Sequence, residues 1–131
     1  MYMGPFNLTS QSSDPVFFAR VFSDQEDVGT SYDRVWIGWD QDSSTPPTMV
    51  GRPSSDYNSP PPWNSATNIG DRGSMAQPDI VQLILTGAAG QNNVWLAYCF
   101  SSDGSVDGYT GTYLDIPTIC ANDGNIPPSS I

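Results

Sequence analysis

Residues 79–100, with the sequence DIVQLILTGAAGQNNVWLAYCF, indicate the class of fold more clearly than any other part of the chain. The runs 79–86 and 94–100 are rich in β-branched and aromatic residues, which favour β-strands. The run between them, 87–93, contains glycine and asparagine, which adopt turn conformations at little cost. We therefore expect two strands joined by a hairpin loop.

Three more strands are predicted, at residues 16–22, 33–40 and 109–116. Both faces of the first are largely apolar, which predicts a central strand. In the second, Val35, Ile37 and Trp39 share one face and Trp36 lies on the other, so we expect a half-buried strand with the Trp36 face presented outward. Two Asp-Gly steps precede the third, and the C-terminal half is interpreted as an antiparallel meander.

The rest of the chain is polar and rich in turn-forming residues. The whole chain has 12 glycines and 12 prolines, and Glu26 is its one glutamate. Residues 1–14 are expected to be a polar lead-in, 41–78 an irregular Pro-rich loop with short strands at 48–50 and 67–69, and 121–131 a polar tail. One all-β domain is predicted over residues 1–131, an antiparallel β-sandwich or small jelly roll.

The charged residues exclude several functions. The chain has 14 acidic and 4 basic residues, a formal net charge of -10, and neither histidine nor lysine. Histidine-based catalytic dyads, histidine-ligated metals and lysine Schiff bases are therefore excluded. Clustered cations for nucleic acid are missing too. With no visible signal peptide and no apolar run of about 18 residues, membrane insertion is not expected.

Two aromatic groups are candidate sugar sites. Trp36 lies beside Asp40 on one predicted strand, and the Pro-rich loop contains Tyr57, Trp63 and Asn64. A pyranose stacks its C–H face on an aromatic ring while carboxylates and amides bind its hydroxyls. The alternative for both groups is that the aromatic side chains are packed core.

Calcium and a disulfide are two further candidate features. Asp103 and Asp107 lie on one turn and offer carboxylate oxygens, which calcium prefers, although ordinary solvated turns have the same composition. Cys99 and Cys120 would close a loop of about 20 residues if bridged, and two buried thiols are the alternative.

These patterns predict a non-catalytic, lectin-like carbohydrate-binding protein, extracellular or displayed on a surface. Asp33, Asp40 and Asp115 are the carboxylates that a glycosidase would need, but aspartates at strand ends ordinarily cap turns, so we expect no enzyme. The alternative function is a self-assembling subunit of a capsid, surface layer or filament. The expected partners are therefore glycans or identical subunits in a homo-oligomer, with no cofactor other than the candidate calcium.

Overall fold

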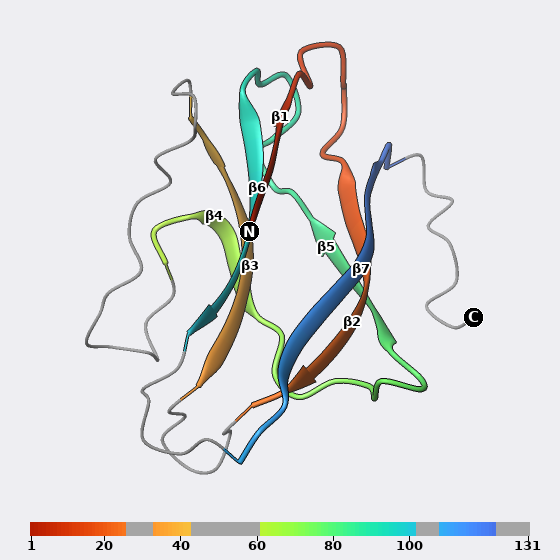
Figure 1. The fold of residues 1–131 in the computed structure, drawn as a ribbon. Coiled ribbons are helices and arrows are strands. Elements are labelled where there is room, and N and C mark those ends of the chain that lie inside the picture. Colours follow the sequence, from red (N-terminus) through yellow and green to blue (C-terminus); the bar gives the residue numbers. More distant parts are fainter. Residues whose placement is uncertain (26–32, 43–60, 102–107, 123–131) are drawn as a thin grey trace.

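The computed structural model describes residues 1–25, 33–42, 61–101 and 108–122 (Figure 1). These residues contain no helix, and so none that is long and apolar enough to cross a membrane. They form seven strands: β1 (Tyr2–Phe6), β2 (Val16–Asp24), β3 (Arg34–Gln41), β4 (Asn64–Asn68), β5 (Asp79–Ile84), β6 (Val94–Ser101) and β7 (Gly111–Cys120).

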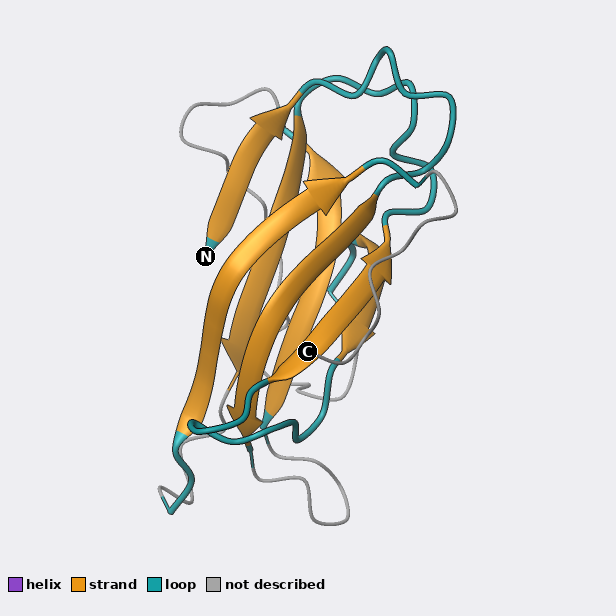
Figure 2. Ribbon diagram, turned by 90° about the vertical axis from the view of Figure 1, so that its right-hand side faces the viewer, coloured by secondary structure: helices purple, strands orange, loops and turns teal. Residues whose placement is uncertain are grey.

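The strands make two antiparallel sheets that pack face to face (Figure 1, Figure 2). One sheet has the order β1-β6-β3-β4, and the other has the order β5-β2-β7. The predicted all-β sandwich is therefore confirmed. Strand β2 is central in its sheet, as its apolar residues on both faces predicted.

The pairing of the strands is nested along the chain. Strand β3 pairs with β4, β2 with β5, and β1 with β6. This is the order in which a jelly roll is wound, and β7 is added on the free side of β2. Sequence neighbours therefore tend to lie in opposite sheets.

The predicted hairpin and meander over the C-terminal half are wrong. Strands β5 and β6 lie in different sheets, and the segment between them crosses the end of the sandwich. Leu85 and Ala88 within this crossing are fully buried, and the Leu85 N–H donates to the Pro15 carbonyl (2.9 Å). These buried anchors hold the chain against the core at the point where a hairpin would turn back.

The expectation that residues 1–14 are a polar lead-in is also wrong. Strand β1 pairs with β6, and Met1 and Tyr98 exchange backbone bonds of 2.7 and 3.0 Å. Leu8 then enters the main core. The predicted short strand at 67–69 is present as β4, shifted towards the N-terminus, whereas residues 48–50 lie outside the described part.

The main core lies between the sheets. Phe17, Ala19 and Val21 point into it from β2, and Val35, Ile37 and Trp39 point into it from β3, as the alternation predicted. Val81, Leu96 and Tyr98 complete its centre. The inward direction of these residues fixes which side chains lie on the two outer faces.

Candidate functional site

A second aromatic cluster covers the outer face of the β1-β6-β3-β4 sheet. Trp36, Trp63, Trp95 and Ala97 form it, so the structure brings together two tryptophans that the sequence placed in separate candidate sites. Gly38 allows this contact, because a Cβ added there would lie 3.1 Å from the Trp63 Cβ. Trp63 therefore packs directly over the backbone of β3.

Burial removes these tryptophans from solvent. Trp36 and Trp63 are each 6% exposed, so the expectation that the Trp36 face is presented outward is wrong. The Trp95 indole is also fixed, because its Nε1–H donates to the Asp42 carbonyl (2.7 Å). A sugar ring needs an open aromatic face, and neither Trp36 nor Trp63 offers one in this arrangement. Their packing matches the alternative interpretation, a core role.

Two of the other predicted site residues lie next to the tryptophan cluster, because Asp40 is paired with Trp95 and Asn64 follows Trp63. Asp40 accepts a bond from the Gln41 N–H (2.8 Å), and Asn64 is exposed at the start of β4. Tyr57, Asp103 and Asp107 lie outside the described residues. No group of three or more metal-ligating side chains occurs within the described ranges.

The disulfide is not formed, because Cys99 and Cys120 are both free thiols. Cys99 lies on the outer face of β6, packed against the tryptophan cluster, whereas Cys120 ends β7 in the opposite sheet. The sequence spacing could not show this separation, since it depends on which sheet each strand joins.

The β5-β2-β7 sheet faces the viewer in Figure 2. Its outer face carries a different set of side chains. Because Phe17, Ala19 and Val21 point inward, the residues between them, Phe18 and Arg20, point outward together with Phe22. Cross-strand neighbours on this face extend it in rows, which are Phe22 with Tyr113, Arg20 with Asp115 and Ile80, and Phe18 with Thr118 and Gln82.

Two of these rows lie side by side. One is a pair of aromatic rings, and the other is an ion pair. The Phe22 and Tyr113 rings are stacked, with centroids 6.0 Å apart and planes 15° apart, and Tyr113 is 53% exposed. In the next row the Arg20 Nη1 lies 3.8 Å from the Asp115 Oδ2, with side chains 42% and 67% exposed. An open aromatic ring therefore lies beside a guanidinium, a carboxylate and, one row further, the Gln82 amide.

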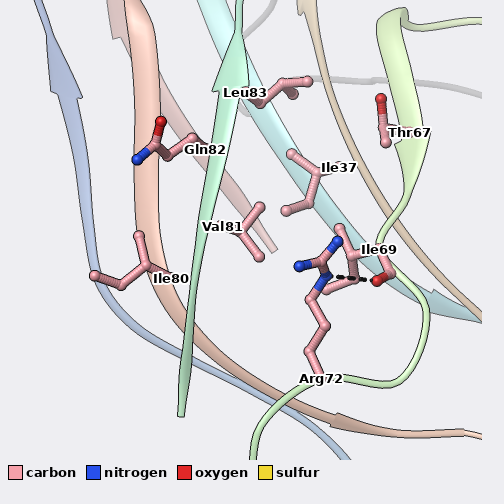
Figure 3. A pocket seen from close by; sticks show the side chains of 8 residues that line it. All are labelled: Ile37, Thr67, Ile69, Arg72, Ile80, Val81, Gln82 and Leu83. Carbon is pink, nitrogen blue, oxygen red and sulfur yellow. Dashed lines mark hydrogen bonds between the residues drawn. The ribbon is translucent and has the colours of Figure 1, made fainter. Parts of the chain in front are cut away.

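A small cavity opens at the side of the sandwich, between β4 and β5 (Figure 3). Its volume is about 120 Å³, and its lining includes Ile37, Ile69 and Val81, with Arg72 at one end. The Arg72 Nε donates to the Ile69 carbonyl (2.7 Å). Pockets for small molecules usually measure 300–1,000 Å³, so this cavity is small for a whole sugar.

The exposed sheet face was missed by the sequence reasoning, although its signal is present. Phe18, Arg20 and Phe22 alternate along one strand, and Tyr113 and Asp115 alternate along another. Without the knowledge that β7 pairs with β2, these two short patterns cannot be combined into one surface. Comparison with known proteins yields no match to a family model, a curated protein or a solved structure.

Proposed function

We propose that this protein is a non-catalytic carbohydrate-binding β-sandwich protein that binds a glycan on the outer face of the β5-β2-β7 sheet. The observation that carries the proposal is the pairing of the stacked Phe22 and Tyr113 rings with the exposed Arg20 and Asp115 pair. Such a protein would act outside cells or on a surface, where glycans are displayed.

The side chains on this face suit the two chemical sides of a sugar. The C–H face of a pyranose packs on an aromatic ring, and Tyr113 has a ring that is more than half exposed. The Arg20 guanidinium donates only and the Asp115 carboxylate accepts only, so together they can bind neighbouring hydroxyls of either polarity. Successive rows are two residues apart along the strands, which places the aromatic row about 6.8 Å from the ionic row.

The setting of Asp115 supports binding rather than hydrolysis. A glycosidase requires a carboxylic acid whose pKa is raised by an apolar site, and a second carboxylate about 5–10 Å away. Asp115 is instead 67% exposed and lies beside the Arg20 guanidinium. Its side chain therefore lies largely in solvent, and not in the apolar site that the acid of a glycosidase occupies.

A glycan array read with three proteins tests the proposal. The wild type is expected to give a signal, and Tyr113→Ala is expected to lose at least tenfold of it while keeping the wild-type circular dichroism spectrum. Tyr2→Ala is the matched control, because Tyr2 is also an exposed tyrosine but lies on β1 in the other sheet. It should bind as the wild type does.

Two results would contradict this function. One is a folded wild type that binds no glycan on the array or in solution. The other is equal loss in Tyr113→Ala and Tyr2→Ala, because binding would then not depend on the β5-β2-β7 face.

A further inference from the structure

The small cavity lies between an edge strand of each sheet. Strand β4 ends one sheet and β5 ends the other, and the cavity opens between them at the side of the sandwich (Figure 3). Four aliphatic side chains line it, those of Ile37, Ile69, Val81 and Leu83. Among the described residues that line this cavity, only Arg72 is charged. The cavity therefore combines largely apolar walls with one cationic group.

Arg72 is held in place at its backbone and at its side chain. Its backbone N–H and carbonyl exchange two hydrogen bonds of 2.9 Å with Ser23, near the end of β2. Its Nε donates to the Ile69 carbonyl (2.7 Å). The guanidinium is therefore already positioned before a ligand arrives, which lowers the entropy that binding would cost.

The other guanidinium nitrogens of Arg72 are available to a ligand. Figure 3 shows them directed between Ile37 and Val81, away from the Ile69 carbonyl. Within the described ranges no carboxylate forms an ion pair with Arg72, whereas Arg20 is paired with Asp115 on the outer sheet face. The two Nη atoms of a guanidinium match the two oxygens of a carboxylate, which arginine commonly binds through two parallel hydrogen bonds.

A buried hydroxyl lies on the same side of the chain as the Arg72 side chain. Residues directly opposite each other in an antiparallel bridge point the same way, so Ser23 shares the side of Arg72. Ser23 is 2% exposed, and its Oγ has no hydrogen-bond partner in the part of the chain that the structure describes. A buried hydroxyl in this state costs free energy, so this side of Arg72 lacks a hydrogen-bond acceptor.

We propose that the cavity binds a short, branched aliphatic monocarboxylate. The carboxylate lies on the Nη donors of Arg72, and the alkyl group lies among Ile37, Ile69 and Val81. The volume of about 120 Å³ holds about four carbon-sized groups at roughly 30 Å³ each, which matches the isobutyl group of isovalerate. The inference does not depend on sugar binding, because the proposed glycan surface is the outer face of the β5-β2-β7 sheet.

The charge of the protein favours a single carboxylate over a polyanion. A net charge of -10 repels anions, and it repels a phosphate or a dicarboxylate more strongly than a monoanion. Arg72 is exposed, so water and salt weaken its attraction for the ligand. Burial of the alkyl group must therefore supply much of the affinity. For a ligand of this size, a dissociation constant in the millimolar range is expected.

The first test is a titration of the wild type followed by amide NMR at neutral pH and constant ionic strength. Isovalerate should shift the amides of Ile69, Arg72 and Val81. Isoamyl alcohol, which has the same alkyl group without the charge, should bind at least tenfold more weakly, and isoamylamine should not bind. From acetate to isovalerate the affinity should rise about fourfold for each added carbon, and it should fall again for octanoate.

The second test compares two variants that each change the net charge by one unit. Arg72→Gln should bind isovalerate at least tenfold more weakly. Asn92→Asp is the matched control and should bind as the wild type does. Asn92 is exposed and follows Leu85, which binds Pro15 before β2, so it lies at the end of the sandwich opposite the Ser23 bridge. Circular dichroism checks that both variants are folded.

Three results would overturn the proposal. One is a wild type whose cavity amides do not shift with isovalerate. Another is equal affinity for isovalerate and isoamyl alcohol, because the guanidinium would then contribute nothing. The last is a folded Arg72→Gln that binds isovalerate as tightly as Asn92→Asp does. Loss of glycan binding in Tyr113→Ala, or its absence in the wild type, has no bearing on these results.

Discussion

At the scale of single residues, Asp14 holds the segment that crosses from β5 to β6. Its Oδ2 accepts from the Gly87 N–H (2.9 Å) and its Oδ1 from the Ala89 N–H (3.0 Å). These bonds lower the pKa of Asp14 from its ordinary value of 3.8 because they favour the charged carboxylate. The folded protein therefore holds this proton less tightly than the unfolded chain does.

The lowered pKa predicts how acid affects stability. The contribution of Asp14 is fully present above the unfolded pKa of 3.8 and is lost as the pH falls through the lower folded value. Asp14→Asn should cost about 1 kcal/mol in the free energy of unfolding at pH 7. Urea denaturation between pH 2 and 7 measures both effects. Asp79→Asn, at an exposed aspartate on β5, is the matched control, and an equal effect of both variants would contradict the role of Asp14.

Tyr98 predicts the behaviour at high pH. Thr112 donates its hydroxyl proton to the Phe22 carbonyl (3.1 Å), so the Tyr98 hydroxyl must be the donor in its bond to Thr112. Burial raises the pKa of Tyr98 above its ordinary value of 10.0, because it disfavours the charged phenolate. Stability due to the neutral phenol is present below pH 10 and is lost as the pH rises through the folded pKa.

Tyr98→Phe should remove the part of the stability loss at high pH that is due to Tyr98. It should also cost about 1 kcal/mol in the free energy of unfolding at pH 7. Thermal unfolding followed from pH 7 to 11 measures it, with Tyr109→Phe, at an exposed tyrosine, as the control. The same alkaline slope in wild type and Tyr98→Phe would contradict this account.

At the scale of elements, the outer face of β3 is covered by Trp63, the residue just before β4. Trp63 covers Gly38 and packs with Trp36 and Trp95. Trp63→Ala should therefore cost about 3–5 kcal/mol in unfolding free energy, since it empties a buried site and exposes two other indoles. A red shift of tryptophan fluorescence in the folded variant would accompany this loss. Tyr2→Ala should change stability by less than about 0.5 kcal/mol, and a similar result for Trp63→Ala would show that the cluster is not a second core.

The strands were predicted where a regular apolar pattern marks them in the local sequence. They were missed where that pattern is interrupted. Apolar alternation predicted β2, β3, β5 and β6 to within about two residues, which is the usual uncertainty of strand ends. Strand β1 was missed because Gly4 and Pro5 interrupt its pattern. The partner of each strand was not predictable either, because a strand has the same alternation whether its neighbour is adjacent or remote in sequence.

For the candidate site too, the sequence showed which residues matter but not which residues lie together. The sequence identified the aromatic residues, but the burial of Trp36 depends on Trp63, which returns from a remote segment to cover it. The Phe22 and Tyr113 pair exists only because β7, the last strand, joins β2. Both surfaces are products of non-local pairing, which composition and periodicity do not report.

At the scale of the whole molecule, the nested order of strands has a consequence for folding time. Among the strands that the structure describes, only β3 and β4 are sequence neighbours that pair, while β1 pairs with β6 and β2 pairs with β5 and β7. Remote pairing requires closing large loops first, so all-β domains of this kind fold in milliseconds to seconds rather than microseconds. On the ribosome, β2 must wait for more than half of the chain to be made before either partner exists. Until then its apolar faces are open to chaperones and to other nascent chains.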